Sequence, residues 1–142
     1  MHAPIASTVI AIALIPVAFL FLHAFISGLK KLRFHNITGF LAICGDLSVS
    51  IGYMIYRSLG GKVGNSALHL AGGILVYFII HGIVSSVVIL LELTVLITGL
   101  NSKKHEKPAR IHKKAAVVLF FLWWFAFLSG ELFYVVNYLI KQ

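Results

Sequence analysis

The chain has 142 residues, of which 60% are hydrophobic and only 11% are charged, and its net charge is +8. Soluble domains average about 45–50% apolar and about 25% charged residues, so this composition excludes a soluble enzyme, a disordered chain and a nucleic-acid-binding domain. We expect a single membrane domain over residues 1–142.

Four apolar segments are long enough to cross a bilayer. A transmembrane helix needs about 20 mostly apolar residues, and the candidate spans are residues 5–29, 37–56, 67–100 and 115–140. Short connections between successive spans favour antiparallel neighbours. The predicted fold is therefore an all-α integral membrane protein, an antiparallel up-down bundle of four transmembrane helices in contact with the lipid bilayer.

The basic residues are distributed unequally over the two ends of these spans. Residues 30–36 and 101–114, which follow the first and third spans, hold nine of the twelve lysines and arginines. Cytoplasmic loops carry the excess of positive charge, so we expect both basic loops in the cytoplasm and both chain termini outside. In the second loop, Pro108 is expected to act as a helix breaker.

Three of the four acids, Asp46, Glu92 and Glu131, lie inside apolar spans, where a carboxylate is costly and calls for a partner. Asp46 shares one face of the second span with His35, eleven residues before it, and with Arg57, eleven residues after it. We group Arg57 with the three acids as buried ionisable residues. The acids could pair with Arg57 or with histidines, or they could be protonated and transfer protons, and both interpretations are open.

One histidine lies within or at the end of each span. Bundle cores build cofactor and metal sites from facing helices, and haem iron accepts two axial imidazoles. The candidate axial ligands of one or two haems b are His23, His35, His81 and His112. His35 and His112 match in depth, whereas His23 with His81, or His35 with His81, are the other pairs to consider.

A metal ion held by His35, His81 and His112 is a related prediction. Copper is the competing metal because imidazole suits it. It is the less favoured cofactor, since Cys44 is the only cysteine and Met54 is not spaced as its partner.

Several segments resemble the YozB/CtaM-type family of small multi-span membrane proteins from bacteria and archaea. The resemblance covers about residues 25–140 and rests on residues 31–35, 53–56, 80–81 and 112–116, followed by Trp123, Gly130 and Tyr134. It implies inward-facing histidines at His35, His81 and His112, a prokaryotic plasma membrane and, for some members, a role in assembling haem-copper oxidases.

This chain departs from the family pattern in three places. Arg57 stands where the family usually has a further histidine, Leu90 stands where it has a helix-breaking proline, and the 101–114 loop is longer. The missing histidine argues against a shared four-histidine metal site, but a haem held by two of the remaining histidines is compatible with the pattern.

Three functions follow from these patterns. The leading hypothesis is a b-type haem protein that transfers electrons as a subunit of a respiratory complex, with the other subunits as partners and a quinone left open as a further one. The alternative is a non-catalytic assembly factor for a haem-copper terminal oxidase. The third is an accessory structural subunit whose histidines only form hydrogen bonds. In none of the three is the chain expected to be an enzyme by itself.

Overall fold

The computed structural model describes residues 5–61, 72–102 and 105–140, and these residues form helices and short connections without a strand. The helices are α1 (Ile5–Leu29), α2 (His35–Ser58), α3 (Gly73–Asn101) and α4 (Glu106–Val135), and α4 continues into a π-helical turn, η1 (Val136–Ile140). The predicted all-α fold with four long helices is confirmed.

The helix boundaries agree with the sequence for α1 and differ most for α4. Residues 67–71 of the third predicted span lie outside the described residues, and α3 begins at Gly73, after Gly72 with a φ of +57°. α4 begins at Glu106, ahead of the fourth predicted span, so part of the segment 101–114 that was expected to be a connection is helical. Pro108 does not break α4, because it lies in the first turn. The backbone N–H groups of the first turn have no acceptor within the helix, so the missing N–H of proline costs no hydrogen bond there.

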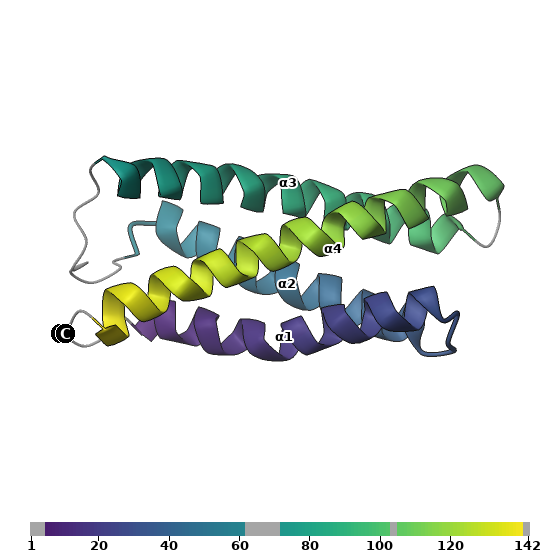
Figure 1. Cartoon of the computed structure of the whole chain (residues 1–142), viewed down its shortest axis with the longest axis horizontal. Helices are drawn as coiled ribbons and strands as arrows, with labels where there is room; N and C mark the ends of the chain where they lie inside the picture. Colours follow the sequence, from purple (N-terminus) through teal and green to yellow (C-terminus); the bar gives the residue numbers. More distant parts are fainter. Residues whose placement is uncertain (1–4, 62–71, 103–104, 141–142) are drawn as a thin grey trace.

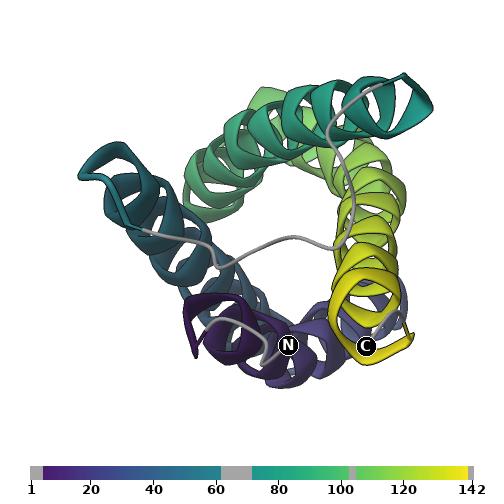
Figure 2. The ribbon, with the colours of Figure 1, turned by 90° about the vertical axis from the view of Figure 1, so that its left-hand side faces the viewer.

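The four helices lie along the long axis of the molecule and form a ring when viewed from one end (Figures 1 and 2). The closest packing is between α1 and α2 and between α3 and α4. These two pairs meet along α1 and α4, and less closely along α2 and α3. A hydrogen bond of 3.0 Å between the hydroxyls of Thr8 and Tyr134 joins the beginning of α1 to the end of α4.

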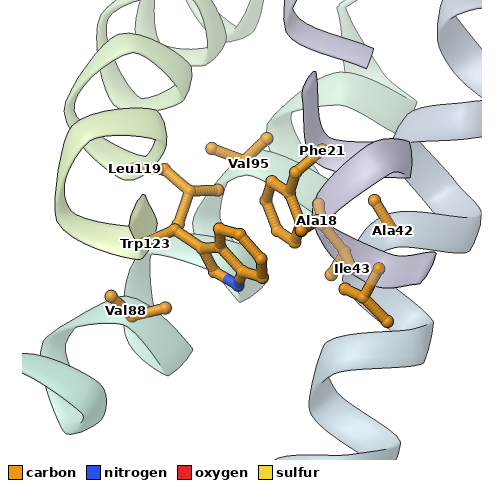
Figure 3. Packing of buried hydrophobic residues seen from close by; sticks show 9 residues of the cluster. Ala18, Phe21, Ala42, Ile43, Val88, Val95, Leu119 and Trp123 are labelled. Atoms are coloured by element: carbon orange, nitrogen blue, oxygen red, sulfur yellow. The ribbon is translucent and has the colours of Figure 1, made fainter. Parts of the chain in front are cut away.

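The core is a column of apolar side chains inside this ring. The rings of Phe21 and Trp123 stack at its centre, with centroids 4.3 Å apart (Figure 3). The buried cluster consists of Val17, Ala18, Phe21, Ala42, Ile43, Val88, Val95, Leu119 and Trp123.

Large apolar side chains also cover the outside of the bundle. Phe19, Leu90 and Phe121 are 70%, 65% and 65% exposed, and they come from three different helices. Each of the four helices is long and apolar enough to cross a membrane. An apolar exterior around a well-packed interior is the arrangement that a lipid environment favours.

Candidate functional site

His35 opens α2 and packs against the last turn of α1. A Cβ atom at Gly28 would lie only 2.7 Å from Cε1 of His35, so the imidazole occupies the space that a side chain at Gly28 would fill. Nδ1 of His35 lies 2.8 Å from the carbonyl oxygen of Ala24. Because a carbonyl can only accept a hydrogen bond, Nδ1 donates its proton to Ala24, and the lone pair of the neutral ring is on Nε2.

His112 is held in the same way by α3. A Cβ atom at Gly99 would lie 3.0 Å from Cε1 of His112, and Nδ1 of His112 donates to the carbonyl oxygen of Val95 over 3.0 Å. The Val95 carbonyl also accepts from the Thr98 hydroxyl at 3.4 Å, just as the Ala24 carbonyl accepts from Ser27 at 3.1 Å. Both rings are therefore fixed in the same tautomer by the same kind of backbone contact.

The two imidazoles approach each other edge to face from α2 and α4. Their centroids are 6.1 Å apart, and their planes cross at 71°. Both side chains are half-buried, and within the described residues neither Nε2 takes part in a hydrogen bond. A histidine that ligates a metal usually donates its other N–H to a carbonyl or carboxylate in this manner.

This spacing fits two ligands of a single ion. A bond between a metal and an imidazole nitrogen is about 2 Å long, so two imidazoles on opposite sides of one ion have centroids about 6 Å apart. Two neutral imidazoles are a donor set that suits haem iron and copper. The residues present therefore fit either group in ligand type and in spacing.

The two histidines occupy equivalent positions in two helical pairs. We call α1 with α2 the first hairpin and α3 with α4 the second hairpin. Both hairpins place buried residues at the same distances from the site. These residues lie seven and eleven positions after His35 or His112, and four, seven and eleven positions before Gly28 or Gly99. The equivalent pairs are Ala42 and Leu119, Asp46 and Trp123, Ala24 and Val95, Phe21 and Glu92, and Val17 and Val88. The site thus lies on an approximate twofold axis.

A polar layer lies further along this axis, about 16 Å from His35 as estimated from the helical rise. Trp123 Nε1 donates to Oδ1 of Asp46 over 3.0 Å, and the Ser50 hydroxyl donates to Oδ2 over 3.3 Å. The carboxyl of Glu92 faces that of Asp46. Glu92 is 0% exposed, yet neither of its oxygens has a hydrogen-bond partner of regular geometry. The sequence reading expected Arg57 or a histidine as the partner of Asp46, and it missed the indole of Trp123.

His81 lies in the other half of the bundle. Its Nδ1 is 2.8 Å from the hydroxyl of Ser129, which itself donates to the carbonyl of Ala126, and Tyr77 donates to the carbonyl of Ser129. Fourteen residues of α3 separate His81 from Val95, which is about 21 Å along the axis. His81 therefore does not join the pair formed by His35 and His112.

His23 is exposed on α1, and its Nδ1 lies 3.3 Å from the hydroxyl of Thr38. It pairs with neither His35 nor His81, so the structure brings together one of the histidine pairs considered from the sequence. In the described part of the chain, no three histidine, cysteine, aspartate or glutamate side chains are placed to hold one metal ion. The predicted site made of His35, His81 and His112 is not formed, because equal helical faces do not imply equal depth.

Two of the ionisable residues do not belong to the core. Grouping Arg57 with the buried residues was wrong: its side chain is exposed in the last turn of α2, where it donates to the carbonyl of Gly61 over 3.3 Å. A long cationic side chain near a helix end reaches outward readily and can bind the free carbonyls there. Glu131 is half-buried on α4 and forms no hydrogen bond within the described residues.

No family model matches the sequence, and neither a curated protein nor a solved structure shows significant similarity to it. The resemblance to the YozB/CtaM-type family therefore stays a prediction.

Proposed function

We propose that this chain is a multi-pass protein of a prokaryotic plasma membrane with an antiparallel up-down topology. Four helices of spanning length and an apolar exterior support insertion into a bilayer. The basic residues near the end of α1 and the beginning of α4 support a cytoplasmic position for that end of the bundle, with both termini outside. The pair of His35 and His112 then lies near the cytoplasmic side.

Within this membrane setting, we propose that the protein is a b-type haem protein that transfers electrons as a subunit of a respiratory complex. The observation that carries this proposal is the pair of imidazoles at 6.1 Å, each with Nδ1 bonded to a backbone carbonyl and Nε2 free. When bound, haem supplies a one-electron redox centre.

The protein's own residues would perform two tasks at such a centre. The carbonyls of Ala24 and Val95 accept hydrogen bonds from Nδ1 of His35 and His112 and so orient both rings, which leaves Nε2 of each ring as the ligating nitrogen. Gly28 and Gly99 allow the rings to lie against α1 and α3. The rings of Phe25 and Phe120 stack with centroids 3.9 Å apart and join α1 to α4.

The test is the cofactor content of the purified full-length protein, measured by absorption spectroscopy and by pyridine haemochrome assay. We expect haem in the unmodified protein and its loss in His35→Ala and in His112→Ala. The variants His81→Ala and His23→Ala serve as matched controls that keep their haem. Protein from a haem-replete host that contains no haem, or haem that survives both substitutions in the pair, would falsify the proposal.

A second candidate is a non-catalytic assembly factor for a haem-copper terminal oxidase, with copper bound at the same two histidines. The spacing of the two imidazoles favours it, because their centroids at 6.1 Å leave room for a single ion between them. This candidate predicts copper rather than haem by metal analysis. It also predicts loss of oxidase activity on deletion of the protein, which would be absent from the mature oxidase.

A further inference from the structure

The polar layer around Asp46 contains a buried group whose bonding is incomplete. Glu92 is fully enclosed by the bundle next to Asp46, and within the described residues neither of its carboxyl oxygens has a hydrogen-bond partner of regular geometry. A buried carboxyl without any partner is costly, because it has lost its hydration and gained nothing in return. The position of Glu92 therefore calls for a ligand.

Asp46 faces Glu92 and already receives two donors. Trp123 and Ser50 each donate to a different oxygen of Asp46. Donors directed at both oxygens favour the carboxylate form of Asp46. Each of those oxygens still has a free lone pair with which to accept one more hydrogen bond.

The charge of the two acids is not balanced by a basic residue. Within the described residues, neither Asp46 nor Glu92 forms an ion pair, and Arg57, the nearest basic residue of α2 in the sequence, is exposed and bonded to Gly61. Two carboxylates that share a site of low dielectric constant repel each other strongly and do not both stay ionised. Protonation of one carboxyl, or a cation held by both, removes this repulsion.

We propose that Asp46 and Glu92 form a proton-binding site, in which Glu92 carries the proton and Asp46 is the carboxylate that accepts its hydrogen bond. This site joins α2 of the first hairpin to α3 of the second, across the contact where neighbouring helices pack least closely. It does not rest on the cofactor proposal, since it lies about 16 Å from His35 along the helix axis.

Infrared spectroscopy of the full-length protein in detergent tests this directly, because a protonated carboxyl absorbs apart from a carboxylate and shifts in D2O. The chain contains a single aspartate, so residue-type labelling with 13C-aspartate reports on Asp46 alone. We expect a protonated carboxyl band at about pH 7 that shifts with 13C-glutamate and not with 13C-aspartate. The band should be lost in Glu92→Gln and kept in the control Glu131→Gln, at the same protein concentration.

Isotope labelling uses the unmodified protein, so the test holds even if Glu92→Gln fails to fold. The absence of a protonated band over the range from about pH 5 to about pH 9 would overturn the proposal. So would a band that shifts with 13C-aspartate only. A third contrary outcome is a band that disappears when choline chloride is replaced by sodium chloride at constant ionic strength, because the bound charge would then be an alkali cation rather than a proton.

Discussion

The first and second hairpins have similar residues at equivalent positions near the histidines and different residues further along the bundle. At one end they are alike: a histidine lies on a glycine of the preceding helix and bonds to a carbonyl four residues before that glycine. Eleven residues after the histidine, Asp46 in the first hairpin corresponds to Trp123 in the second, and seven residues before the glycine, Phe21 corresponds to Glu92. The contacts across the axis are therefore an acid pair on one side and an aromatic stack on the other.

This comparison shows what each layer requires. At the histidines the two hairpins are alike, because each imidazole bonds to a backbone carbonyl and lies against a glycine. A carboxylate needs a donor, and a second carboxylate cannot supply one unless it is protonated. The indole of Trp123 supplies it at the position where the second hairpin departs from the first. The two hairpins therefore match where the histidines lie, and they differ where a buried acid needs a hydrogen-bond donor.

The largest effect is expected in the layer where the hairpins differ. Trp123→Ala removes a 2% exposed side chain that both stacks on Phe21 and donates to Asp46. Loss of a buried Trp costs about 3–5 kcal/mol, and unfolding in detergent followed by circular dichroism should show a decrease of this size. Phe121→Ala, at an outward-facing position of the same helix, is the control and should cost far less. Equal losses in both variants would contradict the packing described for the core.

An intermediate effect is expected from substitution of the two glycines against which the histidines pack. A Cβ atom at Gly28 meets Cε1 of His35 at 2.7 Å, closer than the 3.0 Å at Gly99 with His112. Disturbing the support of a ligand lowers affinity by about 10–100-fold, and Gly28→Ala should weaken haem or metal binding more than Gly99→Ala. Affinity is measured by titrating the cofactor-free protein. Gly52→Ala is the control, because a Cβ at Gly52 meets nothing within 4 Å; an unchanged affinity in Gly28→Ala would show that this contact does not position the ring.

The smallest effect is expected at the other end of the bundle, where the hairpins are joined by Thr8 and Tyr134. Tyr134→Phe removes this hydroxyl without creating a cavity, so we expect a loss of about 0.5–1.5 kcal/mol in the same unfolding measurement. Ser86→Ala is the matched control, since the Ser86 hydroxyl bonds only to the carbonyl of Gly82 in its own helix. A loss in Ser86→Ala as large as in Tyr134→Phe would mean that the bond between hairpins adds nothing to stability.

Much of the fold was accessible from the sequence, but only part of the site was. The hydropathy of the spans predicted four helices, and matching depth predicted the pairing of His35 with His112. His81 was grouped with His35 and His112 for a metal site because a helical stripe fixes the face of a residue and not its level relative to another helix. The helical part of residues 101–114 was not predicted, since Pro108 is taken as a helix breaker unless the first turn of the helix is already known.

The roles of Gly28 and Gly99 also could not be predicted from the sequence. Each glycine lies before its histidine at a different distance in the sequence, seven residues in one hairpin and thirteen in the other. Because the two spacings differ, the sequence shows no regular repeat. The equivalence becomes visible only when the structure shows each imidazole in contact with its glycine. The indole that binds Asp46 was missed for a similar reason, because it comes from a helix 77 residues away.

The equivalent positions in the two hairpins also bear on how a chain of this architecture can be built. Two copies of one helical hairpin, associated side by side in the same orientation, would be sufficient to build this ring with one histidine from each copy, and parallel repeats of this type occur in other membrane proteins. A homodimer, however, must place identical residues at the positions of Asp46 and Trp123. Fusion of two hairpin genes removes that constraint, so a single chain can keep a shared ligand pair while one half evolves an acid and the other evolves its donor.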